Sequence, residues 1–151
     1  MNKKSLFYAI VFLSSFCSVG LAQNSNKLPT KQMNILIHIT HGAENPTGAA
    51  LGFLVAKTAI EEGHKVTLFL AGEAVKLLQD STLNTLTGIG TGKLLDHYEA
   101  IVKGKGKFYL SGNSSKARGL TDADITGKPA EFASPNVLIR LSVESDRMFT
   151  Y

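Results

Sequence analysis

Apolar and polar residues follow one another in blocks that predict strands followed by helices. Residues 34–40 are β-branched and apolar on both faces, which is typical of a parallel strand buried between two helical layers. After the polar turn at residues 41–44, Asn45 can cap a helix and Pro46 suits its first turn. Apolar residues then recur at helical spacing until Gly63, where we expect the helix to end.

The same alternation continues along the chain. We expect further strands at residues 65–71, 107–110, 129–132 and 147–151, and helices at residues 73–79, 94–103, 115–118 and 134–146. Residues 80–93 are rich in Thr and Gly and are expected to form an irregular loop. The pattern predicts an α/β fold: a three-layer α/β/α sandwich with a mostly parallel five-stranded sheet, flavodoxin-like in general appearance.

The N-terminal residues have the composition of a secretory leader. Lys3 and Lys4 precede an apolar stretch at residues 6–16, and small residues at positions 20 and 22 suit cleavage before Gln23. We therefore expect a signal peptide at residues 1–22, a flexible lead-in at residues 23–32, a folded domain at residues 33–151, and a periplasmic or secreted protein. A retained membrane anchor is one alternative. A lipoprotein attached through Cys17 is another, although the bulky Phe16 before it argues against it.

Cysteine content and charge narrow the chemistry further. Cys17 is the single cysteine and lies in the expected leader, so the mature domain would have no disulfide, no thiol chemistry and no thiolate metal site. The formal net charge of the full chain is only +4, and the basic residues are scattered. These features argue against a nucleic-acid partner. We expect no cofactor and no membrane span after cleavage of the leader.

Two histidines stand three residues apart near the end of the first predicted strand. On a strand, odd spacing directs His38 and His41 to opposite faces, so we expect no metal site formed by this pair. His38 fits a hydrogen-bonded core position, whereas His41 is either a functional residue or an ordinary turn residue. Glu44 follows in the same turn, either as a solvated carboxylate near a helix start or as a ligand or acid/base group.

The glycine-rich residues 88–93 resemble a phosphate-binding loop only superficially. A P-loop needs a glycine where Thr87 stands, and it needs a preceding strand. We therefore expect a flexible loop here.

Residues 111–119 form a polar turn between a strand and a short helix, with Arg118 one turn later. Backbone N–H groups at such a helix start favour an anion. Ser111 or Ser114 activated by His41 would be a candidate nucleophile. However, the chain has no G-x-S-x-G elbow and no identifiable partner acid. A polar turn with a single cap explains the same residues without catalysis.

Several of these segments together resemble the DsrE/DsrF-like (sulfur-relay, TusD-like) family. The resemblance rests on their order and spacing: the first strand and turn, the GHKVTLFL run at residues 63–70, the segment ending at residues 116–120, and residues 144–147. It implies a small α/β/α domain that assembles into homo- or hetero-oligomers.

The resemblance also implies where a relay member would have its active cysteine, with six residues between it and an Arg-Gly pair. Ser111 stands there, and Ser114 stands where some relatives have a second cysteine. A serine hydroxyl cannot form a persulfide, and the relay works in the cytoplasm, so we expect the fold without the sulfur-transfer chemistry.

These observations lead to one functional expectation and two alternatives. We expect an exported DsrE-like domain that binds a small ligand or a protein partner, without covalent chemistry, at the carboxyl edge of its sheet. The residues expected there are His41, Gly42, Glu44, Asn45, Ser111, Gly112, Asn113, Ser114 and Arg118. The alternatives are a hydrolytic or metal-assisted enzyme using His41, Glu44 and Ser111 or Ser114, and a structural oligomer subunit.

We also expect a homo-oligomer. Leu83, Leu86 and Ile89 are spaced through the polar segment at residues 80–93, and their joint exposure would create an apolar patch. This segment is therefore expected at or near the contact between subunits.

Overall fold

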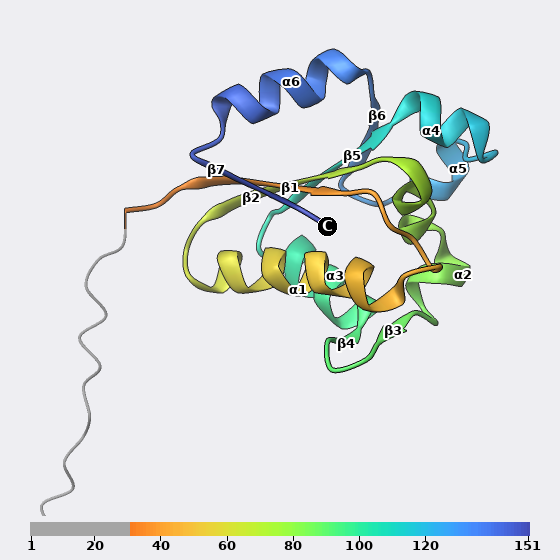
Figure 1. Cartoon of the computed structure of the whole chain (residues 1–151), viewed down its shortest axis with the longest axis horizontal. Coiled ribbons are helices and arrows are strands. Elements are labelled where there is room, and N and C mark those ends of the chain that lie inside the picture. Colours follow the sequence, from red (N-terminus) through yellow and green to blue (C-terminus); the bar gives the residue numbers. More distant parts are fainter. Residues whose placement is uncertain (1–30) are drawn as a thin grey trace, which may run out of the picture. The chain divides into compact units, whose positions relative to one another are not determined.

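Five parallel strands form the central sheet of the protein (Figure 1). The computed structural model describes residues 31–151, so the expected leader and most of the lead-in lie outside the described residues. The strands are β1 (Asn34–Ile39), β2 (Lys65–Leu70), β5 (Lys107–Ser111), β6 (Ala130–Ala133) and β7 (Arg147–Thr150). They lie in the order β6-β5-β2-β1-β7, and each neighbouring pair is parallel. The expected α/β architecture is confirmed.

Helices cover both faces of this sheet. Helices α1 (Pro46–Glu61) and α3 (Leu94–Lys103) lie on one face, and α6 (Pro135–Glu144) lies on the other (Figure 1). Because side chains alternate along a strand, Ile35, Ile37 and Ile39 enter the core beneath α1 and α3. Leu36 and Phe69 point the other way and pack against α6.

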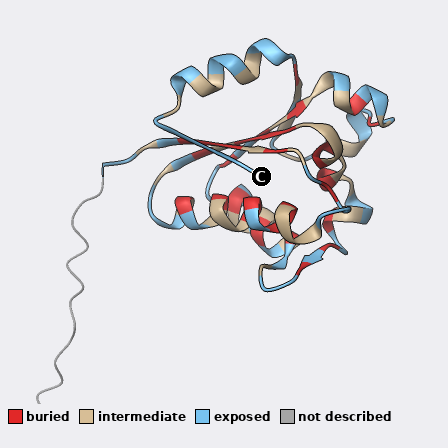
Figure 2. Ribbon diagram, viewed as in Figure 1, coloured by how far each residue is buried: buried red, intermediate tan, exposed pale blue. Residues whose placement is uncertain are grey.

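The layer formed by α6 is thin. None of the residues of α6 is fully buried, whereas α1 buries six of its residues (Figure 2). The main core therefore lies between the sheet and the α1–α3 layer, and the α6 face keeps partly accessible side chains.

Short elements connect these parts. They are the 3-10 helix η1 (Gly72–Leu78), α2 (Asp80–Leu83), the strands β3 (Thr87–Gly88) and β4 (Gly92–Lys93), α4 (Gly112–Ala117) and α5 (Asp122–Ile125). Strands β3 and β4 pair as an antiparallel hairpin.

Two expectations for residues 80–93 are wrong. The segment is not an irregular loop, because α2 and the β3–β4 hairpin occupy most of it. It does not expose three aliphatic side chains either: Leu83 and Leu86 are 3% and 7% exposed within this domain, and only Ile89 is exposed, at 87%. The physical reason is that the segment folds back onto the main core, of which Leu83 and Leu86 are part. A Cβ at Gly88 would lie 2.9 Å from the Cβ of Ala50, which shows how closely the hairpin approaches α1.

Within residues 31–151, no helix combines the length and the apolar character that crossing a bilayer requires.

Candidate functional site

Three turns meet at the carboxyl edge of the sheet because β5, β2 and β1 are neighbours there. The turn after β1 contacts the turn after β2: a Cβ at Gly42 would lie 2.7 Å from the carbonyl oxygen of Glu73. The turn after β5 is joined to the same place, because the Gly72 N–H donates to Ser114 Oγ at 3.0 Å. We call this junction of residues 41–45, 72–73 and 111–118 the carboxyl-edge site.

An ion-pair network lies on one side of this site. Arg118 donates from Nε and from Nη2 to Glu73 Oε1, at 2.9 and 2.8 Å, and its Nη1 donates to the Ser114 carbonyl oxygen at 3.2 Å. Lys76 approaches the other carboxylate oxygen of Glu73 at 3.2 Å. The hydrogen bonds from Arg118, and then from Lys76, lower the pKa of Glu73 below its usual value. The network fixes the direction of the guanidinium group.

The two serines act as acceptors for backbone N–H groups. Ser111 caps α4, and its Oγ accepts from the Ser114 N–H at 3.4 Å. Ser114 Oγ accepts from Gly72 across the turn. Among the described residues, neither hydroxyl is hydrogen-bonded to a histidine. Gly112 begins α4, and Asn113, the next residue, is exposed. This arrangement provides no base for a serine nucleophile.

The turn after β1 is ordered by its own side chains. Both carboxylate oxygens of Glu44 accept from the Gly42 N–H, at 2.8 and 2.9 Å, and His41 Nδ1 lies 3.4 Å from Glu44 Oε1. The side chains of His41 and Glu44 are 51% and 49% exposed, so solvent weakens this pair. Asn45 is confirmed as the cap of α1, because its Oδ1 accepts from the Gly48 N–H at 3.0 Å.

The structure therefore brings the predicted residues to one edge but divides them into two groups. Ser111, Ser114 and Arg118 form one group, and His41, Glu44 and Asn45 form the other. Glu73 lies between them, with its side chain bound to Arg118 and its carbonyl oxygen against Gly42. The sequence did not identify Glu73, because its only local signal is its position at the start of η1.

His38 differs from its expected role. It lies half-buried beside Phe69, with ring centroids 6.0 Å apart in an edge-on arrangement, but its buried Nε2 has no hydrogen-bond partner in the described part of the chain. Burial lowers the pKa of His38, which favours the neutral ring. Phe69, the neighbour of His38 on β2, offers no hydrogen-bonding group to the ring, and the expected hydrogen bond to the His38 side chain is not found among residues 31–151. In the described part of the chain, no three His, Cys, Asp or Glu side chains are grouped so as to hold a metal ion.

Residues 88–93 form the tip of the β3–β4 hairpin. A buried histidine supports this tip, because His97 Nε2 lies 2.6 Å from the Thr91 carbonyl oxygen. Close packing on α1 accounts for Gly88, whereas Gly90 and Gly92 have φ values of +74° and +85°, which suit the turn of the hairpin.

Comparisons with known proteins agree with this geometry. The profile described as the DsrE/DsrF-like family matches residues 33–151. The chain belongs to the DsrE/DsrF-like family. No curated protein matches this member of the family.

Two solved structures resemble its fold. The ychN protein from E. coli is 15% identical, with a TM-score of 0.63 over 80% of this chain and 100% of that one. The conserved protein BT1422 of unknown function from Bacteroides thetaiotaomicron is 12% identical, with a TM-score of 0.55 over 79% of this chain and 95% of that one. At these identities the likeness supports the shared fold only.

Proposed function

We propose that this DsrE/DsrF-like domain is exported and binds a small ligand or a protein partner at its carboxyl-edge site without forming a covalent bond to it. The observation that supports the proposal most directly is the fixed guanidinium of Arg118 between two strand-end turns. An arginine held in place by Glu73 and by the Ser114 carbonyl loses little side-chain freedom when it meets a partner. Polar groups grouped at the carboxyl ends of parallel strands are the usual recognition elements of this architecture.

The hydrogen bonding of the serines supports binding rather than persulfide transfer. Ser111 stands where the family relay requires a cysteine, and its oxygen caps α4. Ser114 Oγ accepts from Gly72. Neither hydroxyl can take up sulfane sulfur, and the described residues contain no cysteine.

The proposal is tested by native mass spectrometry of the purified protein, before and after denaturation. We expect a co-purified or added partner to be lost or weakened in Arg118→Ala and in Ser114→Ala. It should remain in Lys116→Ala, which removes an exposed cation from the same helix. Equal retention of the partner in all three variants would show that the carboxyl-edge site does not bind it.

The enzyme alternative rests on one observation, the pairing of His41 with Glu44 at 3.4 Å. A carboxylate that orients an imidazole is a feature of general acid–base catalysis. Hydrolytic turnover that disappears in His41→Ala and in Glu44→Gln would favour this alternative over simple binding.

We also propose that the protein forms a homo-oligomer, as the family resemblance implies. Support comes from large apolar side chains exposed on α6 and β7: Ile139, Val143, Met148 and Phe149 are 64%, 80%, 42% and 42% exposed. Light scattering of the purified protein tests the assembly state. A monomer at micromolar concentration would contradict both the oligomer and the structural-subunit alternative.

A further inference from the structure

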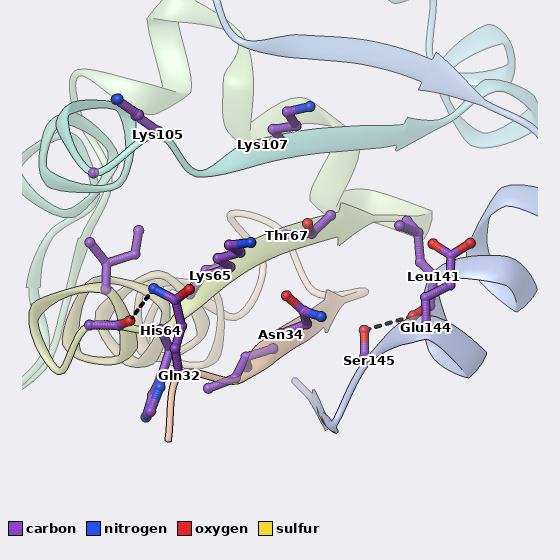
Figure 3. Close-up of a pocket in the computed structure, with 15 residues that line it drawn as sticks. Gln32, Asn34, His64, Lys65, Thr67, Lys105, Lys107, Leu141, Glu144 and Ser145 are labelled. Atoms are coloured by element: carbon purple, nitrogen blue, oxygen red, sulfur yellow. Dashed lines mark hydrogen bonds between the residues drawn. The ribbon is translucent and has the colours of Figure 1, made fainter. Parts of the chain in front are cut away.

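A cavity lies at the amino-terminal edge of the sheet, opposite the carboxyl-edge site; Figure 3 shows its lining residues. Its volume is about 710 Å³, within the range of small-molecule sites in proteins. It begins where β1, β2 and β5 start and is bounded by the end of α6. We call it the amino-edge cavity. The lining residues that matter here are Asn34, Lys65, Thr67, Lys105, Lys107 and Leu141.

Strand register explains why polar groups gather on one wall of this cavity. Asn34 lies opposite Lys65, and Thr67 lies opposite Lys107. Residues 65 and 67 share one face of β2 because side chains alternate along a strand. The side chains of Asn34, Lys65, Thr67 and Lys107 therefore project from the same face of the sheet, toward the α6 side (Figure 3).

Lys105 adds a third cation from the turn that precedes β5. Its φ is +63°, and it is the only non-glycine among the described residues with a left-handed backbone. Gly104 and Gly106 flank it. This conformation favours glycine, so a lysine occupies the position at some cost in stability.

The charge of the three lysines is not balanced within the described chain. Lys57, Lys76 and Lys128 each have a carboxylate within 3.2 Å, whereas Lys65, Lys105 and Lys107 form no ion pair with residues 31–151. The single acid in the lining is Glu144, and Arg140 lies 4.0 Å from it. The cavity therefore has an excess of positive charge.

Two other features suit an organic anion. Ile35 and Ile60 on the α1 side of the sheet, and Leu141 on the α6 side, add apolar surface to the lining of the cavity. Asn34 and Thr67 provide uncharged hydrogen-bonding groups between the lysines. Compensation of a helix dipole explains the lysines only in part: Lys105 follows the end of α3, but Lys65 and Lys107 begin strands.

We propose that the amino-edge cavity binds a small organic anion that has two or more phosphate-type groups, with Lys65, Lys105 and Lys107 as the cations that hold it. The cavity is independent of the carboxyl-edge site, because a six-residue strand separates the two edges by roughly 20 Å. A negative binding result at one site therefore does not count against binding at the other site.

Isothermal titration calorimetry at low salt tests this site with three probes: ADP, pyrophosphate and adenosine. We expect ADP and pyrophosphate to bind, adenosine not to bind, and higher salt to weaken binding. Tighter binding of ADP than of pyrophosphate would show that the apolar lining residues contact an organic part of the ligand. Equal affinities would assign the site to phosphate groups alone, which contradicts the organic part of the proposal.

The variants are Lys65→Ala, Lys105→Gly and Lys107→Ala, singly and together. Each should raise Kd about threefold, and the triple variant at least tenfold. Lys105→Gly removes a charge while relieving its backbone, so its melting temperature should not fall. Lys103→Ala, an exposed lysine at the same edge but outside the lining, serves as the charge-matched control and should bind like the wild type. Absence of binding by both phosphate probes, or unchanged affinity in the triple variant, would overturn the proposal.

Discussion

Arg118 donates two hydrogen bonds, from Nε and Nη2, to a single carboxylate oxygen of Glu73, although the two residues are 45 positions apart in the sequence. This contact joins the end of α4 to the start of η1. It leaves the second oxygen of Glu73 for Lys76. The direction of Arg118 therefore depends on the ionisation of one partly exposed carboxyl group.

The first prediction concerns the pH dependence of stability. The pKa of Glu73 is lowered in the folded protein, so its ionised form stabilises the fold above the unfolded value of about 4.5. This contribution is lost as the pH falls through the lower, folded pKa. We expect Glu73→Gln to lower the urea midpoint at pH 7, and the difference from the wild type to shrink below about pH 4.5.

Glu99→Gln is the control for this experiment. Glu99 is exposed on α3 and forms no ion pair among the described residues. Its urea midpoint should match that of the wild type at both pH values. If the urea midpoints of Glu73→Gln and the wild type differ by the same amount at both pH values, the stabilising role of the ion-pair network is contradicted.

The second prediction concerns the position of the family cysteine. In a Cys17→Ser background, Ser111→Cys places a single thiol at the start of α4, where helix N–H groups lower a thiol pKa. We expect alkylation by iodoacetamide at pH 7 to be roughly fivefold faster than for a free thiol, and acceptance of sulfur from a persulfide donor.

Asn84→Cys is the matched control, because Asn84 is exposed and follows the end of α2. The wild-type domain should incorporate no covalent sulfur. A Ser111→Cys thiol no faster than the Asn84→Cys thiol would show that Ser111 is not equivalent to the relay cysteine.

The third prediction tests the contact between two turns of the carboxyl-edge site. Gly42→Ala would place a methyl group 2.7 Å from the Glu73 carbonyl oxygen, which is backbone and cannot rotate away. We expect a loss of about 1–3 kcal/mol in the free energy of unfolding. At Gly112 the nearest atom to an added Cβ is 3.5 Å away, so Gly112→Ala should change stability little. Equal stability of both variants would show that the turns are not in contact.

The fourth prediction tests whether Leu83 and Leu86 belong to the core of the domain. Because Leu83 and Leu86 are buried within this domain, the double variant Leu83→Asp, Leu86→Asp should unfold the monomer. Circular dichroism measures this directly. Ile89→Asp changes a side chain that is 87% exposed and should leave the fold intact. A double variant that stays folded would show that these two leucines are not buried in the core.

Hydrophobic patterning predicted the strands and long helices because those elements are set by local sequence. The run at β1 and the Asn45–Pro46 start of α1 are examples in which the side chains needed for the element are adjacent in the chain. The apolar spacing of Leu83 and Leu86 was visible as well. Whether they packed inward depended on the path of the β3–β4 hairpin over α1, which local pattern does not specify.

The same limit applies to the candidate site. Predicting that His41, Ser111 and Arg118 share an edge required only the rule that parallel strands end together. Identifying Glu73 as the partner of Arg118 required knowing that β2 lies between β1 and β5. The sequence pattern does not predict the grouping of the three cavity lysines for a similar reason. They come from separate segments that the strand register brings together.

The position of β7 beside β1 has a consequence for the folding of the domain. Asn34 N–H donates to Asp146 Oδ2 across 112 residues, and Thr40 N–H donates to the Tyr151 carbonyl oxygen. Strand β1 precedes the other strands of the sheet in the sequence but gains its second neighbour only when β7, at residues 147–150, docks beside it. Until then one edge of β1 offers unpaired backbone groups to any passing strand. The folding domain is therefore most prone to aggregation just before β7 docks, and a chaperone that covers β1 would help most at that stage.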